Sequence, residues 1–83
     1  MVYGYSAKET NEYGLLEMKE ITFSAPPPVL RDISRFLAEA ASLMEAGAFE
    51  ACSHRHIQSV ITDWDRRFPG KNIVVLAPDD SEQ

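Results

Sequence analysis

The 83-residue chain has a single cysteine, four scattered glycines and no long apolar run. Cys52 has no partner for an internal disulfide, so the fold must depend on packing, as is typical of a reducing cytoplasm. The N-terminus lacks the basic and apolar segments of a signal peptide, and no stretch reaches the roughly 18 apolar residues of a membrane span. The glycines form no phosphate-binding loop. We therefore expect a cytoplasmic protein without a membrane span or nucleotide cofactor.

Basic side chains are also scarce. Thirteen acidic residues against eight basic ones give a net charge of −5, the wrong sign for holding a nucleic-acid backbone. A protein partner of basic character is the more plausible ligand. Apolar residues at 45% and charged residues at 25% are typical of an ordinary soluble domain. The length predicts one domain over residues 1–78, followed by an acidic tail over residues 79–83.

An amphipathic helix of about 19 residues is predicted from Pro28 to Gly47, because apolar residues recur there at spacings of three and four. Each proline disfavours the α region for its predecessor, so Pro28 is predicted as the first helical residue, after Pro26 and Pro27. Gly47 is predicted to end the helix in a left-handed conformation. The predicted apolar stripe consists of Leu30, Ile33, Leu37, Ala40 and Met44, widened by Phe36, Ala41 and Leu43.

Two strands are predicted before the helix, over residues 2–6 and 15–24, forming a hairpin. The apolar phase of the second strand slips by one residue between Met18 and Ile21. Because such a slip would turn every later side chain to the other face, the pattern predicts a β-bulge at Lys19–Glu20.

The segment after the helix predicts two further strands. Residues 72–77 form a β-branched run typical of a buried strand, and residues 52–58 suit a strand followed by a short helix or turn over residues 63–68. This order indicates an α+β fold: a three- or four-stranded, mainly antiparallel sheet packed against one long helix.

A metal site is one chemical interpretation of Cys52, His54 and His56, which would share one face of a strand. Cys52 and His56 would lie roughly 13 Å apart, too far to bind one ion easily, so His54 and His56 would need a further ligand. Cys52 with a nearby histidine is a second, catalytic interpretation. The alternative, which we favour, is that the histidines pack or form hydrogen bonds and Cys52 is a small buried residue.

Two groups of residues are candidates for binding a partner. The first surrounds an aromatic residue in a charged segment, where Trp64 is either an interface anchor or a plug for the end of the core. The second combines tyrosines with carboxylates near the N-terminus and is either a surface for a basic partner or the cover of a thin sheet. The candidates are Asp63, Trp64 and Asp65 in the first group, and Tyr3, Tyr5, Tyr13, Glu9 and Glu12 in the second.

Most of the chain, from about Gly14 to Pro78, resembles the small immunity proteins of bacterial polymorphic-toxin systems, specifically the immunity protein family numbered thirty-two. The resemblance is one of strand and helix patterns rather than of a catalytic signature, and the three consecutive prolines depart from it. The matching segments are residues 14–23, residues 30–37 with Ala40, Ala41, Met44 and Glu45, His54 with His56, and residues 73–75 before Pro78.

The resemblance implies a cytoplasmic, non-enzymatic α+β protein that binds a cognate toxin domain and neutralises it by direct contact. It implies no cofactor and assigns no toxin-contact positions. Two alternatives stay open: a small metal-binding domain or enzyme that uses His54 and His56, and a structural homo-oligomer joined through a free sheet edge or an apolar patch. The protein itself is expected to be a monomer or a homodimer.

Overall fold

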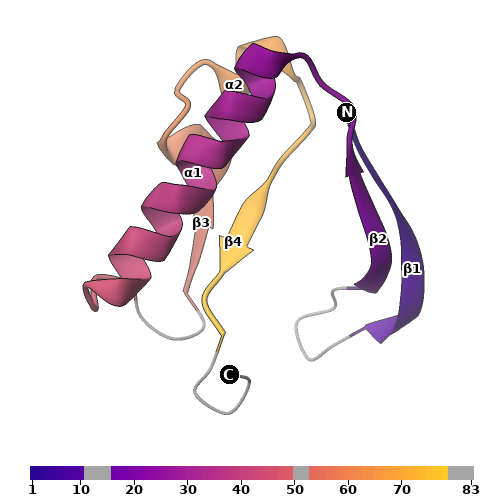
Figure 1. Cartoon of the computed structure of the whole chain (residues 1–83), viewed down its shortest axis with the longest axis horizontal. Coiled ribbons are helices and arrows are strands. Elements are labelled where there is room, and N and C mark those ends of the chain that lie inside the picture. Colours follow the sequence, from indigo (N-terminus) through magenta and orange to yellow (C-terminus); the bar gives the residue numbers. More distant parts are fainter. Residues whose placement is uncertain (11–15, 50–52, 79–83) are drawn as a thin grey trace. The chain divides into compact units, whose positions relative to one another are not determined.

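The structure, a computed structural model, describes residues 1–10, 16–49 and 53–78. The chain divides into two compact units, Met1–Leu30 and Arg31–Gln83. The predicted α+β class is confirmed, since one long helix occurs with two small antiparallel sheets. In chain order the elements in Figure 1 are β1 (Val2–Thr10), β2 (Leu16–Phe23), α1 (Pro27–Glu45), β3 (His54–His56), the 3-10 turn η1 (Ile57–Ser59), α2 (Trp64–Arg67) and β4 (Val74–Leu76).

The predicted three- or four-stranded sheet is wrong. Among the described residues, β1 pairs only with β2 and β3 pairs only with β4, so each sheet has two strands. The alternation of side chains predicts which segments are extended, but the choice of neighbouring strand depends on hydrogen bonds between segments far apart in the sequence.

The hairpin contains the predicted bulge. Tyr5 is paired with Glu20, but the next residue, Ser6, is paired with Met18, so Lys19 is the extra residue on β2. The register shifts twice more, at Ser6/Lys8 and Lys8/Thr10, which the sequence pattern did not predict. The first bulge restores Met18 to the face that carries Ile21, as the apolar pattern requires.

Helix α1 begins at Pro27, one residue before the predicted start. The backbone N–H groups of Val29 and Leu30 both donate to the carbonyl oxygen of Pro26, at 3.1 Å each. Neither Pro27 nor Pro28 has an N–H to satisfy, and the first residues of a helix need none. Two successive prolines can therefore occupy the first turn despite the steric bias against a helical residue before proline.

The predicted stop at Gly47 is confirmed. Gly47 has φ +72°, and its N–H donates to the Met44 carbonyl oxygen while that of Ala48 donates to the Leu43 carbonyl oxygen. This pair of reversed hydrogen bonds is the Schellman motif, which favours glycine because other residues are strained at positive φ.

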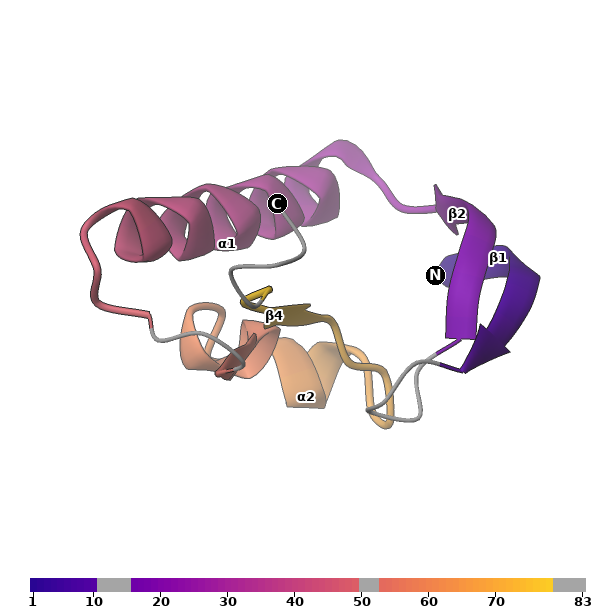
Figure 2. The ribbon, with the colours of Figure 1, turned by 90° about the horizontal axis from the view of Figure 1, so that it is seen from below.

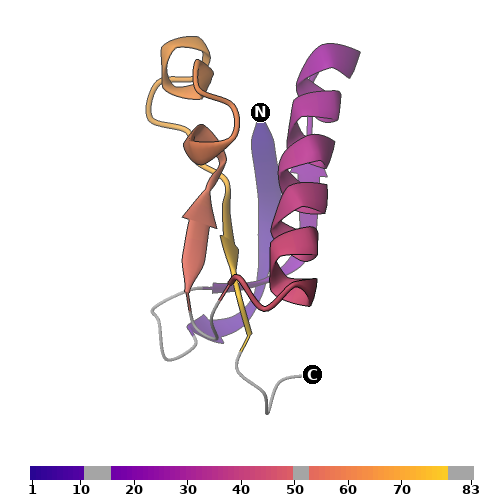
Figure 3. The ribbon, with the colours of Figure 1, turned by 90° about the vertical axis from the view of Figure 1, so that its left-hand side faces the viewer.

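The core of the second unit lies between α1 on one side and β3, β4, η1 and α2 on the other, as Figures 2 and 3 show. The predicted stripe of α1 is confirmed only in part: Ile33, Phe36 and Ala40 are buried, whereas Leu30 and Leu37 are 41% and 44% exposed. The buried apolar residues of this unit are Ile33, Phe36 and Ala40 on α1, with Ile57, Ile61, Trp64 and Ala77 opposite. Val29, in the first turn of α1, is also buried and belongs to the first unit.

The prediction for the segment after α1 is confirmed in part: a strand and a short helix are present, but the strand ends at His56, and Ile57 and Gln58, predicted to belong to it, form η1. Strand β3 is followed at once by η1 and then by the four-residue α2. Strand β4 is less buried than its composition predicts, since Val74 is 44% exposed. In the described part of the chain β4 pairs with β3 alone. Cys52 and residues 79–83, predicted to be a tail, lie outside the described residues. None of the helices in the described part of the chain has the length and apolar character to cross a bilayer.

Candidate interaction surface

One face of the β1–β2 hairpin combines tyrosine with polar and acidic groups. Tyr3 lies opposite Thr22 and Tyr5 lies opposite Glu20. Side chains two residues apart on a strand, and those directly opposite across a pair, project from the same face. Tyr3 and Tyr5 are 62% and 67% exposed, so their rings are available for contact. We call Tyr3, Tyr5, Glu20 and Thr22 the tyrosine face.

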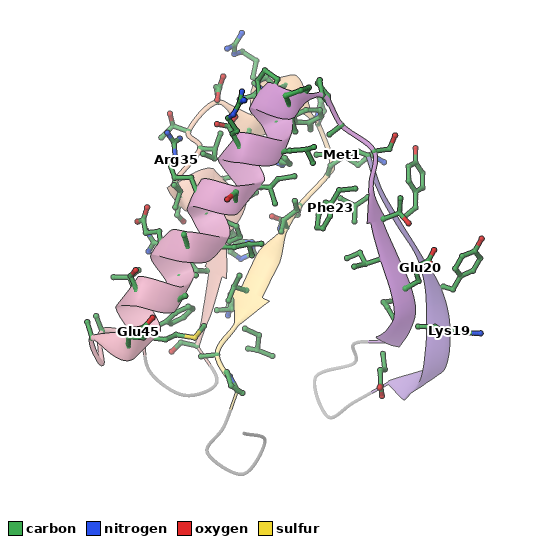
Figure 4. The ribbon with its side chains drawn as sticks, in the orientation of Figure 1. Met1, Lys19, Glu20, Phe23, Arg35 and Glu45 are labelled. Atoms are coloured by element: carbon green, nitrogen blue, oxygen red, sulfur yellow. The ribbon has the colours of Figure 1, made fainter. Side chains whose placement is uncertain are left out.

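The opposite face of the hairpin is apolar and carries Val2, Met18, Ile21 and Phe23 around Gly4. A Cβ atom at Gly4 would meet the end of the Met18 side chain and the carbonyl oxygen of Glu20. Glycine is therefore needed at position 4, because the Met18 side chain lies in the space that a Cβ atom would occupy. Figure 4 shows Phe23 on one side of the hairpin and Lys19 on the other.

Of the predicted N-terminal candidates, the structure brings together Tyr3 and Tyr5. Glu9 belongs to β1, but only its backbone is described, and Glu12 and Tyr13 lie outside the described residues. Sequence reasoning missed Glu20 and Thr22 as members of this surface. The signal for these two residues was the bulge at Lys19, because a bulge sets which face of the strand every later residue occupies. That signal places Glu20 and Thr22 beside the tyrosines only when the partner strand is known.

The second group of candidates is not assembled as a surface around an aromatic anchor. Trp64 is 0% exposed; its Nε1 donates to the carbonyl oxygen of Lys71 at 3.1 Å, and its ring lies 4.6 Å from that of Phe68. Trp64 thus plugs the core of its unit. Asp65 is exposed and accepts a hydrogen bond of 2.8 Å from Nε2 of Gln58.

Asp63 belongs to an ion-pair network that connects α1 with α2. Both terminal nitrogens of Arg67 donate to the same oxygen of Asp32 at 3.0 Å, and Nη1 also donates to Asp63 at 3.2 Å. Arg66 reaches Asp63 at 3.3 Å. The hydrogen bonds to Asp32 raise the pKa of Arg67, so this guanidinium stays charged at every ordinary pH. The network holds two helices together and has no feature of a catalytic site.

His54 and His56 do share one face of β3, with ring centroids 5.1 Å apart in an edge-on arrangement. Nδ2 of Asn72 lies 2.8 Å from Nδ1 of His56, which orients that ring. In the part of the chain that the structure describes, no group of three or more His, Cys, Asp or Glu residues could hold a metal ion. The predicted Cys52 ligand lies outside that part, so the structure supplies two histidine ligands and no third.

One pocket of about 320 Å³ opens beside the C-terminal end of α1. Its size is at the lower limit for small-molecule sites. The Arg55 side chain, which lines it, is engaged with Glu39 at 3.0 Å. The lining residues are Leu43, Ala48, Phe49, Ser53, His54 and Arg55.

Comparison of the chain with protein-family models, curated proteins and solved structures gives no match.

Proposed function

We propose that this protein is an immunity protein that binds a cognate toxin domain and neutralises it by direct, one-to-one contact. The observation that carries the proposal is the tyrosine face of the hairpin. Tyrosine provides a large, rigid contact area with a polar tip, and it is enriched where proteins bind each other. The resemblance of the sequence to small immunity proteins supports the same function.

Charge supports a basic toxin as the partner. The chain carries a net charge of −5, and Glu20 places a carboxylate beside Tyr5 on the tyrosine face. An acidic binder associates faster with a basic partner because opposite potentials steer the encounter, and they favour one orientation of docking. A toxin that acts on nucleic acid has this basic character, since it must approach phosphate groups. The contact would take place in the cytoplasm and would require no cofactor.

Co-expression tests the function. Cells that produce the toxin encoded by the neighbouring gene should survive when this protein is present and die when it is absent. Purified toxin and protein should form a complex in which the two chains occur in a one-to-one ratio. Continued killing in the presence of the folded protein would eliminate the immunity function.

A matched pair of variants tests the surface. Tyr5→Ala should weaken toxin binding by about tenfold or more, whereas Ile21→Ala, on the opposite face of the same hairpin, should change it little. Glu20→Gln should slow association and reduce its dependence on salt. Protection that survives Tyr3→Ala and Tyr5→Ala together would place the toxin contact elsewhere on the protein.

A further inference from the structure

Helix α1 carries a second apolar stripe that its own core does not use. The residues of this stripe follow each other in alternating steps of four and three: Leu30, Ser34, Leu37, Ala41 and Met44. This spacing places them along one line of a helix, beside the buried line of Val29, Ile33, Phe36 and Ala40. Ser34 and Ala41 are exposed, Met44 is half-buried, and Leu30 and Leu37 are 41% and 44% exposed. We call these five residues the α1 seam.

The seam has the pattern of a helix–helix contact. Larger side chains (Leu30, Leu37 and Met44) recur every seven residues, with the small Ser34 and Ala41 between them. Seven-residue repeats of leucine-type residues pack against a neighbouring helix at a small crossing angle. Small residues between them allow the two helix axes to approach closely. The occupant that fits the seam is therefore another α-helix.

The charges that flank the seam favour a second copy of α1 in the opposite direction. Arg31 and Arg35 are exposed in the N-terminal half of the helix, and Glu45 is exposed at its last residue. Figure 4 shows Arg35 part-way along α1 and Glu45 at its C-terminal end. Among the described residues, Arg31 and Glu45 have no ion-pair partner of their own.

An antiparallel pair satisfies these charges. The seam is centred on Leu37, so a two-fold axis there brings Arg31 of each copy near Glu45 of the other. A parallel pair would instead keep the Arg31 residues of both copies at one end and the Glu45 residues at the other, roughly 21 Å apart along the axis at ~1.5 Å per residue, so neither charge would meet its opposite. We propose that the α1 seam is a homodimer interface, formed by two antiparallel copies of α1 related by a two-fold axis through Leu37. This proposal does not depend on the immunity function.

The mass of the full chain in solution tests the proposal. Light scattering or analytical ultracentrifugation over a range of concentrations should show a dimer of twice the 9.3 kDa chain mass. Leu37→Glu places two like charges together at the axis and should raise the dimer dissociation constant by about 100-fold or more. Ser42→Glu introduces the same charge on an exposed position of the same helix, away from the seam, and should change it by less than about threefold.

Charge reversal tests the direction of the helices. Arg31→Glu and Glu45→Arg should each weaken the dimer by about tenfold, and the double variant should recover the wild-type dissociation constant. Circular dichroism verifies that each variant is folded. If Leu37→Glu does not fold, Ala41→Glu serves as the seam variant in its place.

Three results would overturn the proposal. The first is a wild-type chain that stays monomeric at all concentrations, which would assign the seam to a contact within the chain or to no contact. The second is a dimer that Leu37→Glu and Ser42→Glu weaken equally. The third is a double charge variant that dimerises more weakly than either single variant, because the arginine and glutamate would then not face each other.

Discussion

The two units of this protein reach order in different ways. In Arg31–Gln83, helix α1 covers β3, β4, η1 and α2, and fully buried side chains such as Phe36 and Trp64 fill the space between them. In Met1–Leu30, the large apolar side chains described on the hairpin are all at least 36% exposed. The hairpin is instead ordered by a long antiparallel ladder and by the close approach of Met18 to Gly4.

This difference separates the side chains that are available for contact from those that stabilise the fold. A hairpin of two strands is marginal by itself in water, so its exposed side chains add little to its own stability and are free to serve binding. The second unit uses its aromatic residues in packing, which explains why Trp64 is unavailable as an interface anchor while Tyr3 and Tyr5 are available.

The largest expected effect on stability comes from truncating a phenylalanine, and the loss should differ between the two units. Phe36→Ala should lower the free energy of unfolding by about 3–5 kcal/mol, because Phe36 is fully buried and its loss leaves a cavity. Phe23→Ala, at a residue 36% exposed, should lower it by about 1 kcal/mol, the value of a cross-strand contact with Val2. Urea denaturation measures both values. Equal losses would mean that the hairpin contributes to stability as the core does.

A smaller effect is expected from filling the space at Gly4. Gly4→Ala should destabilise the hairpin by about 1–3 kcal/mol, since the new Cβ would press on the carbonyl oxygen of Glu20 and on Met18. Amide hydrogen exchange should increase in β1 and β2, while the fluorescence of buried Trp64 stays unchanged. Gly47→Ala is the matched control: its Cβ meets no atom, so it should cost about 1 kcal/mol through positive φ alone.

The ion pair between α1 and α2 should contribute less. Asp32→Asn removes the carboxylate that receives two hydrogen bonds from Arg67, and it should lower the melting temperature by less than Phe23→Ala does. Because the pKa of Arg67 is raised, deprotonation of this guanidinium removes its stabilising contribution only as the pH rises through and above the ordinary arginine range. Salt is therefore a more informative variable than pH. Added salt should reduce the difference in melting temperature between Asp32→Asn and the wild type. Asp65→Asn affects only a local contact with Gln58 and should lower the melting temperature by less than Asp32→Asn does.

No measurable effect is expected from zinc. Among the residues that the structure describes, His54 and His56 offer two ligands, whereas a structural zinc site requires four. Addition of zinc, or its removal with a chelator, should leave the melting temperature unchanged. A clear rise with zinc that His56→Ala abolishes would instead favour the alternative of a metal-binding domain.

Much of the local structure could be predicted because it depends on neighbouring residues. The bulge at Lys19–Glu20 follows from the phase of apolar side chains within one strand, and the stop at Gly47 follows from the conformational freedom of glycine. The candidate site was predicted only in part. Tyr3 and Tyr5 could be singled out from composition, but Glu20 and Thr22 join them through a pairing between strands, which one strand's sequence cannot specify.

The sequence by itself determined the acidic charge, the α+β class, the long helix and the hairpin. The charge depends on composition, the helix on contacts a few residues apart, and the hairpin on two strands that follow each other in the sequence. Only the tertiary structure decided which of two adjacent stripes on α1 is buried, that Trp64 lies in the core, and that the strands form two separate pairs. The physical reason is that α1 is apolar over a wider arc than its own unit covers, so the buried side is set by the elements packed against it.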